Sequence, residues 1–236
     1  MASYDITLKR TEPVADGTLA LFFDKPGGFE FTAGQCVRLV LKDPPETDGE
    51  GNGRILSLAS APAESELMVA TRLRDTAFKR VLGGLAPGAV LTLKGPYGNF
   101  VLPVEGDAPL VFITGGIGIT PVRSMLLQLL EEGDNRAVTL FYANRRLGDA
   151  AFLHELQQAC AGRSNYELVT ILTQDPNWPG EQGHLDEAML RRHVVELSEP
   201  LYYLDGPPGL VSAMRSVLAG AGVSDDRVRT EEFAGY

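Results

Sequence analysis

Hydrophobic and polar residues alternate in the first part of the chain in short runs separated by turn residues. These runs are rich in β-branched and aromatic residues, which predicts strands. Turn-rich segments such as DKPGG, KDPPETDGEGNG and LAPGA stand between them. The predicted strands are residues 4–12, 18–24, 36–41, 54–60, 66–73 and 90–94, with one brief helix over about 77–85. We therefore expect residues 1–104 to form an antiparallel six-stranded Greek-key β-barrel.

After residue 104 the pattern changes to buried-strand runs that alternate with helical periods. Strands are predicted at 110–114, 138–143, 167–172 and 201–205, with a last short run near Val228, and helices at 121–132, 149–161 and 208–221. Alternation at this spacing implies right-handed crossovers and a parallel sheet with helices on both faces. We expect residues 105–236 to form an α/β nucleotide-binding domain, with the boundary near residues 104–109.

Charge is distributed unevenly between the two parts. The 236 residues carry a formal net charge of −10. Residues 1–104 hold 11 Lys/Arg and 12 Asp/Glu, whereas residues 105–236 hold 10 and 19. This step supports two domains, and the acidic balance argues against a nucleic-acid partner. No apolar run approaches the roughly 18 residues of a membrane span. The first residues lack the apolar segment of a signal peptide, so we expect a cytoplasmic protein without membrane insertion.

Cysteine and histidine are too sparse for a metal centre. The two cysteines, Cys36 and Cys160, form no CxxC pair, and an iron–sulfur cluster needs about four thiolates. The three histidines show no metal-ligand spacing. We expect buried, apolar cysteines and no metal site.

A glycine-rich turn, formed by Gly115, Gly116 and Gly118, joins a buried strand to a helix. Glycine lets the backbone approach a ligand closely, and the N-terminus of the helix favours an anion. A second turn, Gly206-Pro207, follows a later strand and opens another helix. Because the carboxyl ends of parallel strands meet at one sheet edge, the two turns frame a crevice suited to a dinucleotide. A tight turn without a ligand is the other reading.

Six segments in this order resemble the ferredoxin–NADP reductase superfamily across essentially the whole chain. They are FTAGQ at 31–35, RILSLAS at 54–60, GPYGNF at 95–100, TGGIGITP at 114–121, GPP at 206–208 and EF at 232–233. The resemblance implies an FAD-binding barrel followed by an NAD(P)H-binding domain. It also implies an FAD-dependent NAD(P)H oxidoreductase that passes electrons through flavin N5 to a separate acceptor, such as a ferredoxin, a flavodoxin or a small oxidant.

The resemblance assigns flavin-binding roles within the barrel. Arg54 would pair with the flavin pyrophosphate, since a guanidinium is a permanent bidentate phosphate partner. Ser57 would donate a hydrogen bond near flavin N5, and Thr76 would cap the short helix beside the FAD phosphates. The other readings are a solvated arginine, a serine bonded to backbone and a cap without ligand. Leu56 stands where the family has an aromatic residue, so it lacks a π-stack worth about 0.5–1.5 kcal/mol.

The resemblance also assigns roles around the nicotinamide. Thr120 would close on the nicotinamide or its pyrophosphate, or would only cap its helix. Asp205 stands where many members have a cysteine, and could repel electron-rich groups or bond the carboxamide. Phe233 and Tyr236 are the candidates for a terminal aromatic that covers the flavin face as a displaceable gate, with a frayed tail as the other reading.

Two features bear on the nucleotide and on the acceptor. Asp175 follows the third strand of the second domain and could accept a hydrogen bond from the ribose, which favours NADH. Arg145 and Arg146 follow the preceding strand and could instead reach the 2′-phosphate of NADPH. The basic residues Arg72, Arg74, Lys79 and Arg80 lie beside the flavin segment, and Arg72 is counted with the cofactor-binding residues. They could dock an acidic electron carrier or form a solvated helix face.

Leu56 and Asp205 keep two other functions open. One is a non-catalytic electron-transfer or nucleotide-sensing subunit of a larger complex. The other is a reductase that uses free flavin as a substrate.

Overall fold

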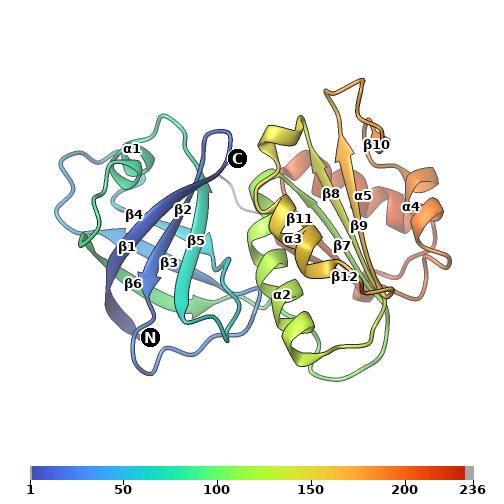
Figure 1. Cartoon of the computed structure of the whole chain (residues 1–236), viewed down its shortest axis with the longest axis horizontal. Helices are drawn as coiled ribbons and strands as arrows, with labels where there is room; N and C mark the ends of the chain where they lie inside the picture. The colour runs from blue at the N-terminus through green and yellow to red at the C-terminus, as the bar shows by residue number, and fades with distance from the viewer. Residues whose placement is uncertain (1, 232–236) are drawn as a thin grey trace.

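The computed structural model describes residues 2–231, whose strands form two separate sheets (Figure 1). The first sheet has the order β4-β3-β6-β1-β2-β5, and its pairings are antiparallel. A bridge between Leu58 and Val69 joins the chain after β4 to β5 and closes the sheet into a barrel. Its strands are β1 (Ser3–Ala15), β2 (Thr18–Asp24), β3 (Cys36–Leu41), β4 (Gly53–Ser57), β5 (Glu66–Arg72) and β6 (Val90–Tyr97). The expected six-stranded barrel is therefore confirmed.

One short helix covers an end of the barrel. It is α1 (Ala77–Gly83), and its Phe78 and Leu82 belong to the apolar core that the strands enclose. The side chain of Thr76 accepts a hydrogen bond from the Lys79 amide, which makes it the cap of this helix. The guanidinium of Arg54, on β4, lies 5.1 Å from the centre of the Phe78 ring. The start of α1 and the β4 arginine are thus held side by side.

The second sheet is parallel throughout, with the order β10-β9-β8-β7-β11-β12. Its strands are β7 (Leu110–Gly115), β8 (Val138–Asn144), β9 (Tyr166–Leu172), β10 (Glu181–Gln182), β11 (Leu201–Asp205) and β12 (Val228–Glu231). The central strand β7 is buried along its whole length, as expected for a strand covered on both faces.

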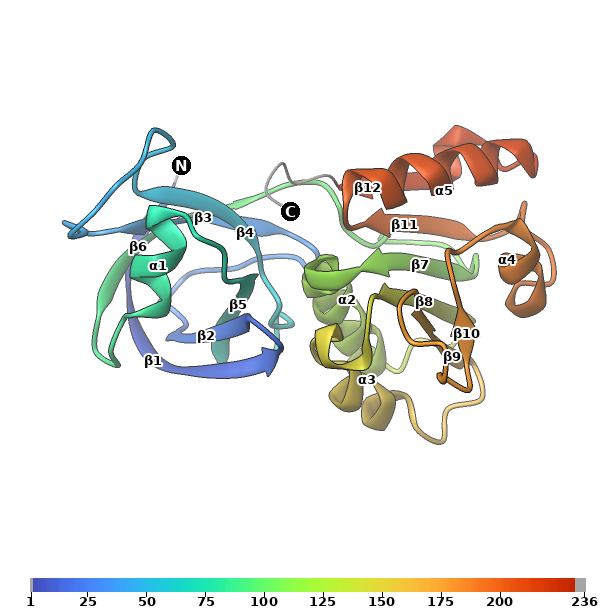
Figure 2. The ribbon, with the colours of Figure 1, turned by 90° about the horizontal axis from the view of Figure 1, so that it is seen from above.

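Helices cover both faces of the parallel sheet (Figure 2). One face packs against α2 (Ile119–Glu132) and α3 (Leu153–Cys160), and the other against α4 (Glu187–His193) and α5 (Pro208–Gly220). Short 3₁₀ turns lie at Gly116–Gly118, Leu147–Asp149 and Asp225–Arg227. This arrangement confirms the predicted α/β sheet.

Three elements differ from the sequence expectation. Strand β10 and helix α4 were not predicted, because α4 has only seven residues and buries only two of them, Met189 and Leu190. So short a helix shows no apolar period. Helix α3 begins at Leu153 instead of 149, since the 3₁₀ turn and a left-handed Phe152 with φ of 59° precede it.

One apolar cluster spans the barrel and one face of the parallel sheet. Barrel residues such as Met68 lie in the same cluster as Met125 of α2. The Ser124 hydroxyl donates to the Ser60 carbonyl at 2.7 Å, and the buried Arg123 donates to the Ala59 carbonyl at 2.6 Å. These contacts fix how the barrel faces the carboxyl edge of the sheet.

Arg123 is also held by carboxylates from both sides of this interface. Its guanidinium is ion-paired with Glu64 of the barrel, at 2.9 Å, and with Glu155 of α3, at 2.5 Å. Within residues 2–231, no helix is long and apolar enough to cross a membrane. Among the same residues, no group of three or more His, Cys, Asp or Glu side chains is placed to hold a metal ion.

Candidate functional site

The two glycine turns lie side by side because β7 and β11 are neighbours, with Thr114 opposite Asp205. A Cβ atom on Gly118 would lie 2.7 Å from the Asp205 carbonyl oxygen, and one on Gly206 would lie 2.9 Å from the Gly115 amide nitrogen. Glycine at 118 and 206 is therefore required for turn-to-turn packing. Gly116 is different, since its φ is +55° and a Cβ there would meet no atom within 4 Å. Among the four glycines of the two turns (115, 116, 118 and 206), Gly116 is the one with open space at its Cβ position.

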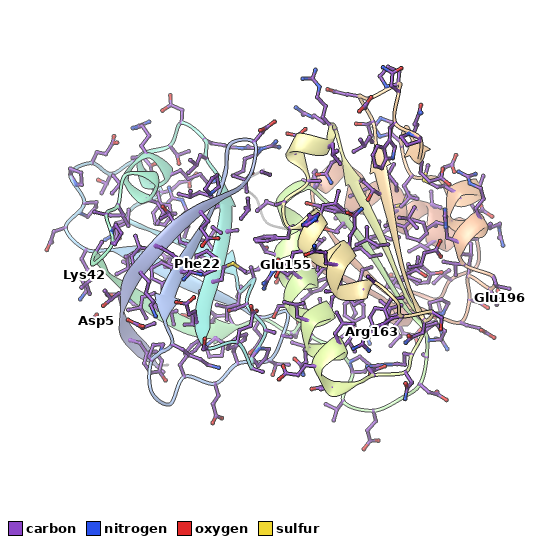
Figure 3. The ribbon with its side chains drawn as sticks, in the orientation of Figure 1. Asp5, Phe22, Lys42, Glu155, Arg163 and Glu196 are labelled. Carbon is purple, nitrogen blue, oxygen red and sulfur yellow. The ribbon has the colours of Figure 1, made fainter. Side chains whose placement is uncertain are left out.

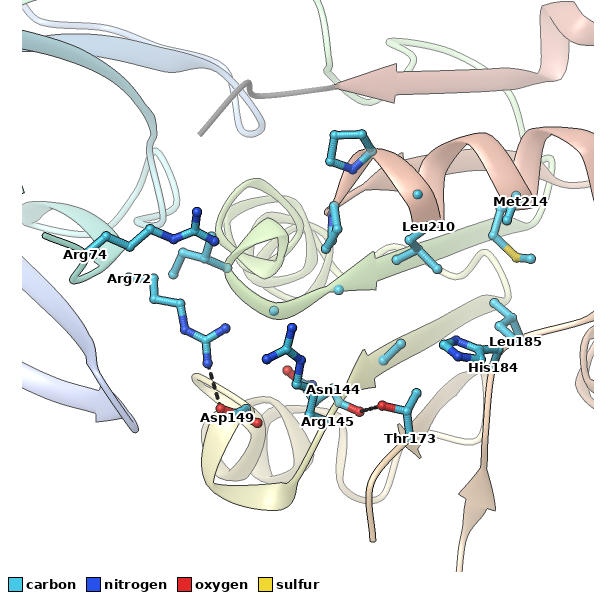
Figure 4. Close-up of a pocket in the computed structure, with 18 of the residues that line it drawn as sticks. Arg72, Arg74, Asn144, Arg145, Asp149, Thr173, His184, Leu185, Leu210 and Met214 are labelled. Atoms are coloured by element: carbon cyan, nitrogen blue, oxygen red, sulfur yellow. Dashed lines mark hydrogen bonds and ion pairs between the residues drawn. The ribbon is translucent and has the colours of Figure 1, made fainter. Parts of the chain in front are cut away.

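A cavity of about 750 Å³ lies between these turns and the barrel (Figure 4). Its cationic side chains come from both sheets, whereas Asp149 is the one carboxylate among its described lining residues. The lining consists of Arg72, Arg74, Lys79, Gly115, Gly116, Ile117, Ala143, Asn144, Arg145, Asp149, Thr173, His184, Leu185, Pro207, Pro208, Gly209, Leu210, Ala213 and Met214. A cavity with this balance of charge is suited to an anionic ligand.

The basic residues of the cavity are not equivalent. Arg72 donates to Asp149 at 2.6 Å, which neutralises both across the interface between the sheets. In the described part of the chain, no hydrogen bond or ion pair engages the side chains of Arg74 and Arg145. Burial lowers the pKa of Lys79, and the charges of Arg74 and Arg54 lower it further. An anion between these cations would relieve their repulsion.

A hydroxyl–carboxyl pair lies where the barrel meets the end of the parallel sheet. The side chain of Ser57, the buried last residue of β4, lies beside the carboxyl group of Glu231, the last residue of β12. Burial raises the pKa of Glu231 to about 7. The Oε2 atom of Glu231 is shielded from solvent and has no hydrogen-bond partner among the described residues. This carboxyl can therefore hold or release a proton near neutral pH.

Cys36 lies next to this pair, opposite Ser57 in the β3–β4 register. A Cβ on Gly98 would contact both Glu231 Oε1, at 3.7 Å, and Cys36 Sγ, at 3.8 Å. Burial, followed by the charge of Glu231, raises the pKa of the Cys36 thiol to about 11. A thiol in this state is a poor nucleophile, so Cys36 acts here as a packing residue.

Arg54 and Leu56 precede Ser57 on β4. Arg54 is mostly buried and bonded to the loop before β4, with Asp48 and Glu50 each 3.0 Å from its guanidinium. The subsite thus accepts anionic oxygens, as a phosphate group would require. Leu56 is half-buried and packs against the barrel core.

Four other predicted residues are not among those that line the cavity. Thr120 is buried, and its hydroxyl donates to the Ile117 carbonyl at 3.1 Å. Asp205 is fully buried beneath the two turns. The Asp175 carboxylate accepts from the Asn177 amide at 3.1 Å within its own turn. Thr76 caps α1. Their roles toward a ligand stay predictions, and Phe233 and Tyr236 lie outside the described residues.

The four basic residues that could dock an acidic electron carrier present less positive charge at the surface than the sequence indicates. They are Arg72, Arg74, Lys79 and Arg80. Arg80 is ion-paired with Glu46 and Asp75, and Arg72 with Asp149. Arg74 and Lys79 turn toward the cavity instead of outward from it. The four residues therefore do not form one uniform cationic surface.

Sequence reasoning did not identify Glu231, Asp149 or His184. Glu231 directly precedes the acidic–aromatic pair at 232–233, which lies outside the described residues. Asp149 and His184 stand in irregular segments, and nothing in the local sequence indicates which strand end they face. Only the folded chain brings them to the cavity.

Comparison with known proteins gives both a family and a fold. Residues 112–216 match the family model described as "Oxidoreductase NAD-binding domain". The chain is 32% identical over 247 residues to ferredoxin–NADP reductase B of Sorangium cellulosum, covering 98% of this chain and 97% of that protein. It is 32% identical over 221 residues to the reductase component DmpP of phenol 2-monooxygenase from Pseudomonas sp. (strain CF600), covering 91% of this chain.

The chain spans 60% of the length of that phenol 2-monooxygenase component. Among solved structures, it superimposes on a ferredoxin NADP+ reductase from Neisseria gonorrhoeae with bound FAD and NADP. The TM-score is 0.81, the sequence identity is 19%, and the match covers 98% of this chain and 99% of that one. This last likeness is one of fold.

Proposed function

Since the chain belongs to the ferredoxin–NADP reductase family, we propose that it is an FAD-dependent NAD(P)H oxidoreductase that passes electrons to a separate acceptor. Acceptors of the expected kind are a ferredoxin, a flavodoxin or a small oxidant. The observation that carries this proposal is the cavity between the two sheets. It brings barrel cations beside the open Gly116 turn of the parallel sheet.

The residues of this cavity fit a dinucleotide that carries a diphosphate. Gly116 presents open backbone, and cations come from both halves of the chain, Arg74 and Lys79 from the barrel half and Arg145 from the loop after β8. The barrel subsite at Arg54 already accepts two carboxylates, which act as stand-ins for the oxygens of the flavin diphosphate. When they are bound, nicotinamide and flavin supply hydride and electron transfer. The protein supplies orientation and charge.

Ser57 and Glu231 are the groups of this chain suited to proton handling at the meeting point of the two sheets. Glu231, with a pKa of about 7, holds its proton in part of the population at neutral pH. The Ser57 hydroxyl can donate to a neighbour or accept from it as that proton moves. Burial of both groups limits the access of water, which protects a hydride from loss.

The nucleotide preference rests on Arg145 and Asp175. Asp175 alone led us to expect NADH. In the fold, however, Asp175 bonds its own turn, whereas Arg145 lines the cavity beside Thr173. This arrangement supports binding of the 2′-phosphate, so we propose that NADPH is accepted at least as well as NADH.

The division into residues 1–104 and 105–236 and the cytoplasmic location stay predictions. Strand β6 ends at Tyr97 and β7 begins at Leu110, which supports a boundary between them. The contacts of Arg54 favour one further candidate function, a reductase that exchanges flavin with solution. The non-catalytic subunit gains no specific support.

Reconstitution of the purified chain tests the proposal. FAD is added, unbound flavin is removed, and the visible spectrum is recorded before and after addition of NADP+. We expect a flavin spectrum that shifts when the nucleotide occupies the cavity. A protein that binds neither FAD nor nicotinamide nucleotide would overturn the proposal.

A further inference from the structure

The guanidinium of Arg54 is held by the chain's own loop. Its Nε atom pairs with Glu50 at 3.0 Å, and its Nη2 atom pairs with Asp48 at 3.0 Å. Its Nη1 atom donates to the carbonyls of Glu50, Gly51 and Gly53 at 3.2, 2.9 and 3.1 Å. Each of the three nitrogens therefore has a partner within residues 48–53.

Asp48 joins the arginine to the helix beside it. Its Oδ1 atom accepts from Arg54, and its Oδ2 atom accepts from the Ala77 amide at 3.2 Å. Glu46, in the same loop, is paired with Arg80 of α1. Acidic side chains of one loop thus engage the cations and an amide of the region to which the flavin diphosphate is assigned.

Displacing this loop from Arg54 costs little free energy. None of residues 42–52 is buried, so its release exposes no apolar core. Gly49 and Gly51 have no neighbouring atom within 4 Å of a Cβ position, which leaves room for the backbone to move. What holds the loop in place is mainly polar, and an anionic ligand can replace such contacts.

We propose that the loop of residues 46–52 occupies the flavin diphosphate subsite and that flavin binds by displacing it. The inference rests on the proposed function, which makes Arg54 the partner of that diphosphate. A guanidinium has five N–H donors in one plane and cannot give the same donors to a carboxylate and a phosphate. Because the loop is tethered, it competes at a high effective concentration. Flavin is therefore a dissociable ligand that exchanges with solution.

A pair of matched double variants tests the competition. D48N/E50Q preserves the size of both side chains but removes the two carboxylates that face Arg54. In the control, E30Q/D43N, the same number of charges is removed from exposed residues that do not contact Arg54. Dissociation constants for FAD and for riboflavin, which has no phosphate, are measured by flavin fluorescence with the full chain.

We expect D48N/E50Q to bind FAD about tenfold more tightly than the unaltered chain, a factor that corresponds to 1.4 kcal/mol. Riboflavin should bind equally to all three proteins, and the control should match the unaltered chain for FAD. Unchanged or weaker FAD binding in D48N/E50Q, or equal tightening in the control, would overturn the proposal. FAD binding to none of the proteins would contradict the proposed function as well.

Hydrogen exchange on the unaltered chain gives an independent readout. Displacement predicts that FAD increases amide exchange in residues 46–52 while it slows exchange at the start of α1. A loop that stays equally protected with FAD bound would show that flavin and loop do not compete.

Discussion

The side chain of Ser57, at the end of a barrel strand, lies beside the carboxyl group of Glu231, at the end of the last strand of the parallel sheet. The pair joins the two halves of the protein at the edge of both sheets. Figure 3 shows how densely side chains fill each half around its sheet. A carboxyl group enclosed at such a junction titrates unlike a surface glutamate.

Glu231 should make stability fall as pH rises. Its pKa is about 7 in the folded protein against an ordinary 4.5, so the folded state binds more protons between these values. The contribution of Glu231 to the free energy of unfolding is therefore complete below pH 4.5, and it is lost as the pH rises to about 7. Because the group is only half-buried, we expect a change of about 2 kcal/mol. Urea unfolding of Glu231→Gln at pH 5 and 7.5 should show that loss abolished, whereas Glu199→Gln, on the surface, should retain it.

Gly118→Ala should destabilise the protein. The new methyl group would lie 2.7 Å from the Asp205 carbonyl, and backbone atoms cannot give way easily. We expect a loss of about 2–4 kcal/mol in the free energy of unfolding. Gly209→Ala, in the first turn of α5 with open space around it, should be neutral or stabilising by up to about 1 kcal/mol. Equal stability of the two variants would show that the turns do not pack as described.

The two glycine turns, after β7 and β11, show how much of the structure can be predicted from the sequence alone. Alternating patterns predicted the barrel, and buried runs between helices predicted the parallel sheet, because both follow from local periodicity. The glycines were interpreted as room for a ligand, yet Gly118 and Gly206 serve contact between two turns that are distant in sequence. A contact of this kind depends on the order of strands in the sheet, which no local pattern reveals.

Arg145→Gln should weaken NADP+ binding by about tenfold or more, since hydrogen bonds to charged groups contribute about 1.5–3 kcal/mol. NAD+ binding should change less than about twofold. Arg146→Gln is the matched control, because the neighbouring arginine does not line the cavity. Calorimetric titration of both nucleotides into each variant measures the effect. An equal loss for NADP+ and NAD+ would indicate that Arg145 binds another part of the nucleotide.

Leu56→Tyr should tighten flavin binding. An aromatic side chain adds a stack worth about 0.5–1.5 kcal/mol, which corresponds to about a 2- to 12-fold lower dissociation constant. Ile55→Tyr provides the control, since Ile55 is exposed and adjacent on the same strand. Fluorescence titration with FAD and riboflavin should show the gain for both flavins. No gain for Leu56→Tyr would indicate that Leu56 does not face the flavin ring.

The site was less predictable than the fold. Arg54 and Ser57 could be named from a short motif, but their partners could not, because Asp48 and Glu50 lie in an irregular loop and Glu231 lies at the other end of the chain. Asp175 and Arg145 were both plausible nucleotide ligands. Which of them faces the cavity depends on the turn after β9, where Asp175 bonds the Asn177 amide.

The most direct test of the proposed function is anaerobic reduction of the FAD-reconstituted chain by NADPH and by NADH. We expect either nucleotide to bleach the flavin absorbance within seconds, NADPH at least as readily as NADH. Bound flavin that neither nucleotide reduces would contradict the proposed function.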